Sequence, residues 1–341
     1  MTGAALLSEI VADQVGADRA RWLVDGVRVH PCVAGSDVAT RAVVAQALGV
    51  LLLDDLLGRV PTGAAYVEEK LARGGQVHLD HGAVRTVTGV ACGELPDGQE
   101  SVTRVLRGLG YSHRHTYDLA RLRMTGRSWC HIDLPADVPQ YFVSELHADQ
   151  FPDSFRRAAG RVLESSRDPL DSQARDDLAG LAADGRISRP RAAALLPVLV
   201  ACFRRHHDLP GLTEYEALLA ESQEMAWIAT EGTVCNHMTD RVDDVVAVAD
   251  AERAAGRPIK DAVEVSGSGR ILQTAHRAAT VPRELRLDGG PSVTRQVPGS
   301  FFEFITRRPL PDGSGPDLAF DAANAQQIFA MTQGRPGPDA S

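Results

Sequence analysis

Cysteines are few in this sequence, and long uninterrupted apolar runs are missing. Five cysteines occur among 341 residues, and none forms a CxxC pair. This pattern excludes a disulfide scaffold and a cysteine zinc site, and it is typical of a reducing compartment. The most apolar stretch, residues 43–57, is interrupted by Asp54 and Asp55 and is too short to span a bilayer. Because the opening MTGAALLSEIVADQ has no basic n-region, we expect a soluble, cytoplasmic protein without a signal peptide.

Basic residues are also in the minority. Lys and Arg number 36 against 45 Asp and Glu, the formal net charge is −9, and no basic stripe with interleaved aromatic residues occurs. This balance argues against a nucleic-acid partner. A hydrophobic fraction of 44% and a charged fraction of 24% are ordinary for a soluble globular protein, without a membrane partner. No GxSxG, phosphate-loop or HExxH motif is present, so these common enzyme signatures are absent.

The order of helix and strand patterns predicts an α+β protein of five segments. They are an N-terminal helical segment (1–75), a first βαβββ module (76–150), a helical insertion (151–230), a second module (231–310) and a loose, Gly- and Pro-rich C-terminal tail (311–341). One such module leaves an apolar sheet face uncovered, so we expect the two modules to pair. The insertion carries no candidate ligand, and we expect it to cover the paired modules.

The stretch LDHGAVRTV (79–87) is predicted to be a buried strand because small and β-branched residues follow helix signals. Side chains alternate along a strand, so His81, Ala83, Arg85 and Val87 share one face. A histidine and an arginine are costly to bury without partners. His81 and Arg85 lie ~13 Å apart along the strand, which leaves room for a small acid between them. The stretch therefore predicts a binding site.

Two further strands carry polar residues toward the same interior. In TVCNHMTDRVDD (233–244), His237 and Thr239 share a face, and in FFEFITRR (301–308) Glu303 lies among phenylalanines. A cation at the carboxylate would offset the cost of burying this charge. Two histidines and one carboxylate from separate strands form the facial triad typical of non-haem Fe(II) oxygenases.

The same residues also have a structural interpretation. A single histidine on a strand is more often a hydrogen-bonded core residue than a metal ligand. Glu303 can equally form a buried ion pair with Arg85 or Arg307. Spacing alone leaves both interpretations open.

Five pieces of the chain, taken together and in order, resemble one known family. They are YVEEKLARGGQVHLDHGAVRTV (66–87), FVSEL (142–146), NHMTDRVDD (236–244), ILQTAHRA (271–278) and FFEFITRR (301–308). The combination resembles the 2-oxoadipate dioxygenase/decarboxylase family of the vicinal-oxygen-chelate superfamily, over about residues 60 to 310. The resemblance implies paired βαβββ modules that form a metal-centred β-barrel. It also implies an Fe(II) cofactor held by His81, His237 and Glu303, and Arg85 matches the family arginine that holds the far carboxylate of the substrate.

Two more residues are expected to contact the substrate, and the family pattern is not matched everywhere. The expected contacts are Thr239 and His276. His276 stands where the family usually has phenylalanine, Asp240 stands where proline is common, and FFEFITRR lacks the usual second glutamate. The resemblance therefore supports the metal-dependent reaction more directly than it supports 2-oxoadipate as the substrate.

The resemblance implies an Fe(II)-dependent dioxygenase that decarboxylates its substrate. Such an enzyme converts a 2-oxo acid, 2-oxoadipate or a related one, and O2 into CO2 and a 2-hydroxy acid one carbon shorter. Two alternatives stay open: a metal-dependent lyase or isomerase of the same superfamily, and a non-enzymatic protein that binds a small molecule.

Overall fold

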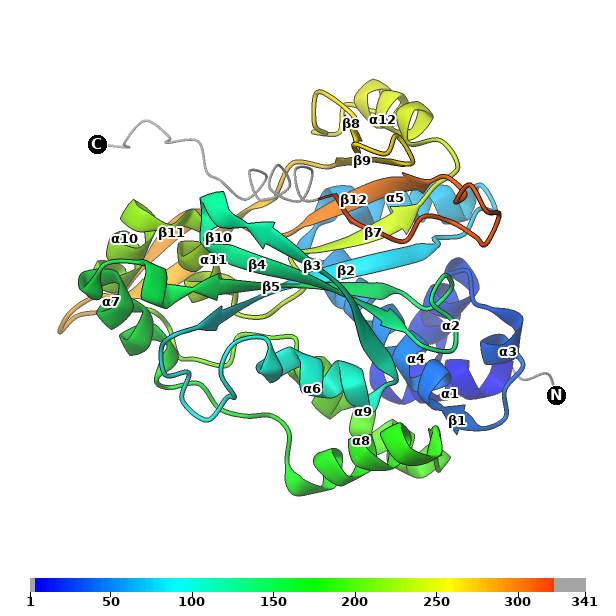
Figure 1. Cartoon of the computed structure of the whole chain (residues 1–341), viewed down its shortest axis with the longest axis horizontal. Helices are drawn as coiled ribbons and strands as arrows, with labels where there is room; N and C mark the ends of the chain where they lie inside the picture. The colour runs from blue at the N-terminus through cyan, green and yellow to red at the C-terminus, as the bar shows by residue number, and fades with distance from the viewer. Residues whose placement is uncertain (1–3, 322–341) are drawn as a thin grey trace.

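Helices dominate the N-terminal part of the protein, whose computed structural model describes residues 4–321 (Figure 1). They are α1 (Ala4–Val15), α2 (Ala17–Gly26), α3 (Pro31–Ala34), α4 (Arg41–Arg59) and α5 (Pro61–Ala72), with the short strand β1 (Ala39–Thr40) before α4. The hydroxyl of Thr40 caps α4 by accepting a hydrogen bond from the N–H of Val43. Most residues of α4 are buried, as its nearly continuous apolar sequence requires.

Two βαβββ modules follow the same plan. The first contains β2 (Leu79–Thr88), α6 (Glu100–Gly108), β3 (Tyr111–Leu119), β4 (Met124–His131) and β5 (Gln140–His147). The second contains β7 (His237–Arg241), α12 (Val245–Ala254), β8 (Glu264–Val265), β9 (Ile271–Ala275) and β12 (Phe301–Arg307). In each module the first strand pairs in parallel with the last one, β2 with β5 and β7 with β12.

The two modules join through their first strands into one eight-stranded sheet. Its strand order is β3-β4-β5-β2-β7-β12-β9-β8, and β2 pairs with β7 in antiparallel orientation. The sheet curls into a half-barrel, and β3 and β8 are its two edges among the described residues. The α+β fold of paired βαβββ modules predicted from the sequence is confirmed. We call the sheet face that carries His81 and Ala83 the inner face.

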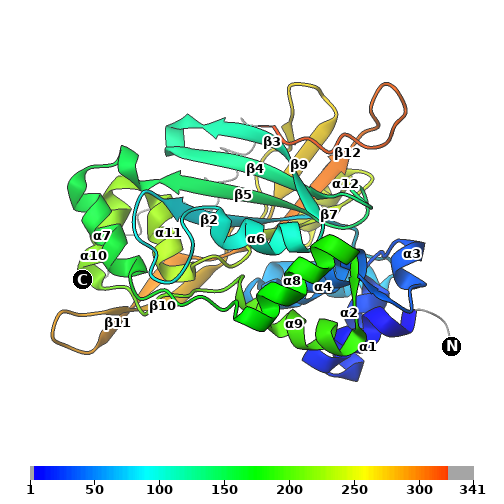
Figure 2. The same ribbon diagram turned by 60° about the horizontal axis from the view of Figure 1, so that its bottom comes forward.

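Five helices lie between the modules. They are α7 (Asp153–Leu163), α8 (Ser172–Asp184), α9 (Arg189–Ala201), α10 (Leu212–Glu221) and α11 (Gln223–Glu231). The short strand β6 (Arg186–Ile187) pairs with β1. Helices α8 and α9 lie with the N-terminal helices on one side of the sheet, whereas α7, α10 and α11 gather at one end of it (Figure 2).

A hairpin interrupts the second module. It consists of β10 (Thr280–Arg286) and β11 (Ser292–Pro298), which pair only with each other among the described strands. Of the predicted C-terminal tail, residues 322–341 lie outside the described part of the chain. Residues 311–321 contain no helix or longer strand and end beside the inner face, at Phe320.

Two apolar clusters cover the two faces of the sheet. On the outer face, Val84 and Val143 pack with α4, α8 and α9. On the inner face, Ala83 and Phe142 pack with residues of α7, α10 and α11, including Trp227. Alternation along β2 and β5 sends successive side chains into different clusters. Arg85 of β2 is thereby enclosed between the sheet and the inserted helix α11.

Candidate metal centre

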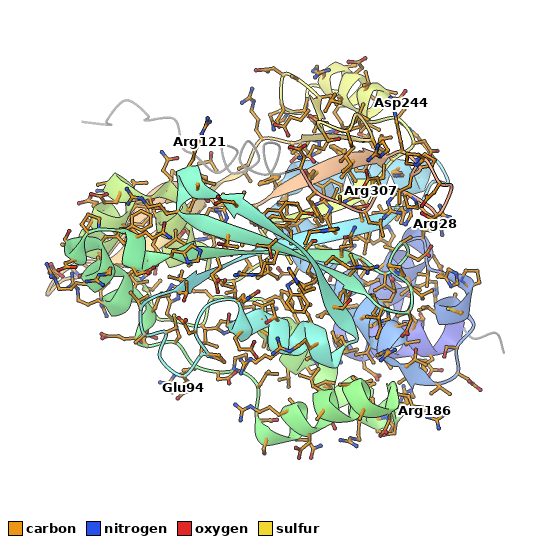
Figure 3. The ribbon with its side chains drawn as sticks, in the orientation of Figure 1. Arg28, Glu94, Arg121, Arg186, Asp244 and Arg307 are labelled. Carbon is orange, nitrogen blue, oxygen red and sulfur yellow. The ribbon has the colours of Figure 1, made fainter. Side chains whose placement is uncertain are left out.

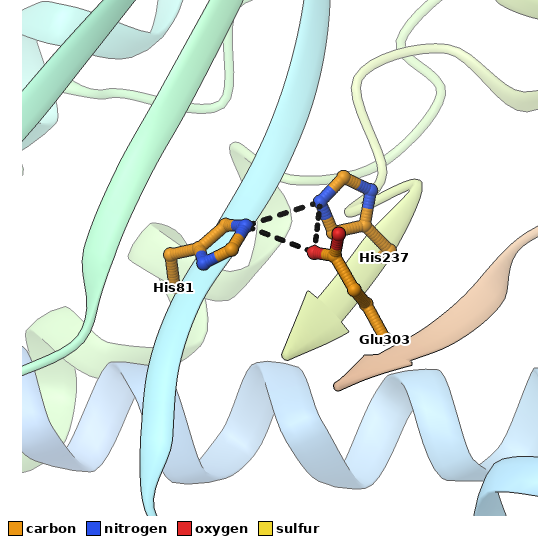
Figure 4. Close-up of side chains that lie close together, drawn as sticks. All are labelled: His81, His237 and Glu303. Carbon is orange, nitrogen blue, oxygen red and sulfur yellow. Dashed lines mark hydrogen bonds and ion pairs between the residues drawn. The ribbon is translucent and has the colours of Figure 1, made fainter. Parts of the chain in front are cut away.

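Three neighbouring strands bring His81, His237 and Glu303 together on the inner face (Figure 4). His81 and Glu303 both lie opposite Thr239, one from β2 and the other from β12. His237 is two residues before Thr239 on β7 and therefore points the same way. Strand pairing thus places three residues that are far apart in the sequence at one point.

The spacing of the three side chains fits one metal ion. His81 Nε2 lies 3.1 Å from Glu303 Oε2, His237 Nε2 lies 3.3 Å from the same oxygen, and the two nitrogens are 3.4 Å apart. Ligand atoms about 2.1 Å from a metal would lie roughly 3.0 Å apart at right angles and roughly 3.4 Å apart at tetrahedral angles. The buried His-His-Glu group can therefore hold a metal, with the donor set of a facial triad.

The hydrogen bonds around the group also favour a cation. His81 Nδ1 lies 2.8 Å from a carboxylate oxygen of Asp80, so a neutral His81 carries its proton on Nδ1 and has a lone pair on Nε2. That lone pair faces Glu303 Oε2 at 3.1 Å, and the other carboxylate oxygen, Oε1, is buried without a hydrogen-bond partner among the described residues. Facing lone pairs and an incompletely paired carboxylate are unfavourable in a buried site unless a cation lies between them.

Burial and neighbouring charges set the protonation of the three groups. Burial lowers the pKa of His237 to about 3, although the charge of Glu303 opposes this shift, so the imidazole is neutral at pH 7. Burial opposes ionisation of Glu303, but His237 and His81 outweigh it and lower the pKa of the carboxyl. His81 differs, because Asp80 and Glu303 outweigh burial and raise its pKa. Metal binding requires neutral histidines and therefore releases any proton held at His81.

Asp80 connects the candidate ligands to a buried charge network that sequence reasoning missed. Arg307, at the end of β12 (Figure 3), donates from Nε at 2.8 Å, and Arg241 donates from Nε at 2.6 Å. Arg307 therefore pairs with Asp80 and not with Glu303. On a regular strand Asp80 would point away from His81, but the pairing register shifts between Leu79 and His81. The sequence contains one indication of this network, since the acidic residue Asp80 directly precedes the candidate ligand His81.

Arg85 also lies on the inner face and has a partner from the helical insertion. Its Nη1 lies 2.9 Å from Glu224 Oε2, and its guanidinium carbon lies 4.5 Å from the ring centroid of Trp227. Among the described residues, the carboxylate that forms an ion pair with Arg85 is therefore Glu224 of α11, and not Glu303. Helix α11 of this insertion packs against the inner face through Trp227 and Glu224, next to Arg85. The insertion therefore contributes this charged residue, which the sequence analysis did not anticipate.

The two expected substrate contacts fall on different faces of the sheet. The hydroxyl of Thr239 donates to Glu303 Oε2 at 2.6 Å and lies 3.2 Å from His81 Nε2, so it belongs to the site. His276 does not, because its Nε2 lies 2.7 Å from Glu252 Oε2 on the outer face. Ala275 is opposite Glu303, so the next residue must point away from it. The expectation for His276 is corrected.

A small cavity of about 30 Å³ borders the metal group. It is lined by His81, Ala83, Phe142, Ser144, Asn236, His237, Gln273, Glu303, Phe320 and Asp321. The rings of Phe320 and His81 meet edge to face, with centroids 4.8 Å apart. Gly126 makes room for Phe142, because a Cβ at this position would collide with the phenyl ring. The cavity thus has aromatic walls and a polar base.

A second and larger cleft, of about 950 Å³, is lined by charged residues such as Lys70, Glu252 and Arg257. We place the candidate site at the smaller cavity because ligand atoms converge only there among the described residues. Within residues 4–321, no helix combines the length and apolar character needed to cross a membrane.

Comparison with protein families identifies the chain. Residues 59–332 match the family described as 2-oxoadipate dioxygenase/decarboxylase. The chain belongs to this family. The match includes both βαβββ modules and all three candidate metal ligands. A comparison with curated protein sequences gives no match.

Solved structures share the fold of this family member. A glyoxalase-superfamily protein from Ralstonia eutropha JMP134 is 48% identical, with 93% of this chain and 99% of that chain covered and a TM-score of 0.89. Hydroxyglutarate synthase from Oryza sativa, in complex with 2-oxoadipate, is 17% identical over 87% of this chain and 96% of that chain, with a TM-score of 0.65. The Pseudomonas putida hydroxyglutarate synthase, also with 2-oxoadipate, is 18% identical over 87% and 74% of the two chains, with a TM-score of 0.62.

Proposed function

We propose that this protein is an Fe(II)-dependent dioxygenase that decarboxylates a 2-oxo acid, either 2-oxoadipate or a related one. The reaction would consume O2 and yield CO2 and a 2-hydroxy acid one carbon shorter. The observation that carries the proposal is the buried His81–His237–Glu303 group beside a cavity. Membership of the 2-oxoadipate dioxygenase/decarboxylase family supports it. The fold shared with hydroxyglutarate synthases that bind 2-oxoadipate agrees with it.

The donor set of the site suits iron. His81, His237 and Glu303 would hold Fe(II), and the bound ion would supply Lewis-acid activation and orientation of the 2-oxo acid and O2. Asp80 accepts the proton of His81 Nδ1 and so keeps Nε2 directed into the site. Thr239 donates to Glu303 Oε2, which fixes the orientation of the carboxylate. We propose that the same hydroxyl contacts the substrate.

The remaining residues of the cavity would position the substrate and exclude water. Phe142 and Phe320 both line it and contact each other, with ring centroids 5.1 Å apart, and they would shield the reacting groups from solvent. Arg85 lies four residues beyond His81 on the same strand face, and we propose that it contacts the far end of the substrate. Its planar set of N–H donors suits a polar group at that distance. The five cysteines are unpaired, which supports work in the reducing cytoplasm.

A panel of 2-oxo acids, tested for CO2 release by the Fe(II)-loaded protein, examines the proposal. We expect release with at least one acid in the panel, and none from Glu303→Ala, which cannot complete the metal group. Release without O2 would favour a metal-dependent lyase or isomerase. Tight binding of a 2-oxo acid without any turnover would favour a binding protein.

A further inference from the structure

The ion pair between Arg85 and Glu224 is removed from water. Arg85 is 0% exposed and Glu224 is 2% exposed. Their Nη1 and Oε2 atoms lie 2.9 Å apart, and the guanidinium also packs on Trp227. An ion pair in such surroundings is strongly coupled, because removing either partner leaves an uncompensated buried charge.

The position of Glu224 is fixed by the helix that carries it. Ser222 caps α11 by accepting a hydrogen bond from the N–H of Met225, and Glu224 lies in the first turn. The positive end of the helix dipole favours a carboxylate there. Trp227, one turn later, donates from Nε1 to the carbonyl of Gly299 at 3.2 Å. Glu224 is therefore held beside Arg85 on a helix anchored at two points.

The pair lies along the same strand face as the metal group. Arg85 is opposite Ser144, and Ser144 lines the cavity together with Ala83 and His81. Arg85 and Glu224 do not line this cavity themselves, but a substrate bound at the metal group and extending along β2 past Ser144 would have them ahead of its far end. That end would meet a guanidinium that already forms an ion pair with the carboxylate of Glu224.

We propose that Glu224 makes this enzyme select a 2-oxo acid whose far end is polar but uncharged, in preference to a dicarboxylic 2-oxo acid. This inference rests on the proposed function. An amide can accept a hydrogen bond from Arg85 through its oxygen and donate one to Glu224 through its nitrogen. A second carboxylate at the same place would share the cation with Glu224 and lie beside a like charge in a buried site.

Three acids of equal chain length test the proposal on the Fe(II)-loaded protein. They are 2-oxoadipate, its ω-amide and 2-oxohexanoate, which end in a carboxylate, an amide and a methyl group. For the wild type we expect kcat/KM for the amide to exceed that for 2-oxoadipate by about tenfold or more, the scale of one like-charge contact. Glu224→Gln should reverse this order by raising kcat/KM for 2-oxoadipate. Glu221→Gln, an exposed glutamate at the end of α10, is the matched control and should leave the ratio unchanged.

Binding of the same acids without O2 gives a second measurement that does not need turnover. A wild type that prefers 2-oxoadipate, with a ratio that Glu224→Gln does not change, would overturn the proposal. A preference for 2-oxohexanoate over the amide would overturn it as well, since the ion pair would then have no role in recognition. If Glu224→Gln fails to fold, as judged by thermal melting, the wild-type order of the three acids decides alone. Absence of turnover with every acid would contradict the proposed function, while the order of binding would still test Glu224.

Discussion

Replacing Asp80 by asparagine should weaken metal binding although Asp80 is not itself a candidate ligand. The carboxylate accepts hydrogen bonds from His81 Nδ1, Arg241 and Arg307, at 2.8, 2.6 and 2.8 Å. Asparagine keeps the shape but removes the charge, and one of its two polar atoms becomes a donor facing another donor. His81 then loses the partner that holds its Nε2 toward the metal group.

Two magnitudes follow from these contacts. Loss of the partner that orients a metal-ligating histidine costs about 10–100-fold in metal affinity, or roughly 1.4–2.7 kcal/mol. Loss of the buried charge leaves Arg307, which is 7% exposed as a residue, without its carboxylate partner. Breaking a buried pair in this way costs about 3–5 kcal/mol in the free energy of unfolding.

The assay must separate these two effects, and Asp240→Asn provides the control. Asp240 is an equally buried carboxylate that accepts from Tyr66 at 2.8 Å and from Lys70 at 2.5 Å, away from the metal group. Both variants should lower the melting temperature, but only Asp80→Asn should lower the Fe(II) affinity measured by anaerobic titration of folded protein. Unchanged affinity in Asp80→Asn, or an equal loss in both variants, would refute the role of Asp80.

Three further predictions concern the ligands, Arg85 and pH. Alanine at His81, His237 or Glu303 should abolish stoichiometric metal loading, measured by elemental analysis, while circular dichroism keeps its helical signal; full iron content in any of them would exclude that residue as a ligand. Arg85→Lys should lower kcat/KM for 2-oxo acids with a polar far end, with iron content unchanged. The expected loss of transition-state stabilisation is about 1–3 kcal/mol, because a charge-assisted hydrogen bond is lost. Loss of iron in this variant would instead mean that Arg85 supports the metal group. Burial lowers the pKa of His207 from 6.5 to about 4. Between these values the unfolded chain binds more protons than the folded one. As the pH is lowered from 7 to 5, His207 alone should therefore reduce the free energy of unfolding by about 2 kcal/mol. Urea titrations should show a smaller loss in His207→Gln, and an identical loss would contradict this assignment.

Residues on regular strands could be predicted from the sequence. His81, Thr239 and Glu303 each lie on a strand whose alternation was visible, and strand pairing brings them to one point. The two-module fold followed from the repeated order of strand and helix patterns. Both inferences depend on local periodicity, which a single sequence contains.

Other parts of the site depend on features that periodicity does not carry. Asp80 reaches His81 only because the strand register shifts, and a bulge leaves no mark in an alternating pattern. His276 was assigned to the site from its place in a motif, yet the pairing of Ala275 with Glu303 sends it to the outer face. Glu224 belongs to a helix, and its contact with Arg85 arises from how α11 packs on the sheet. Such packing across elements distant in sequence is set by the whole fold.

The ratio of O2 consumed to CO2 released tests the proposed function most directly. Fe(II)-loaded protein should take up one molecule of O2 for each molecule of CO2 released when a 2-oxo acid is added, and it should release no CO2 under anaerobic conditions. Product formation that continues without O2, or 2-oxo acid consumption with no oxygen uptake, would contradict the assignment as a dioxygenase.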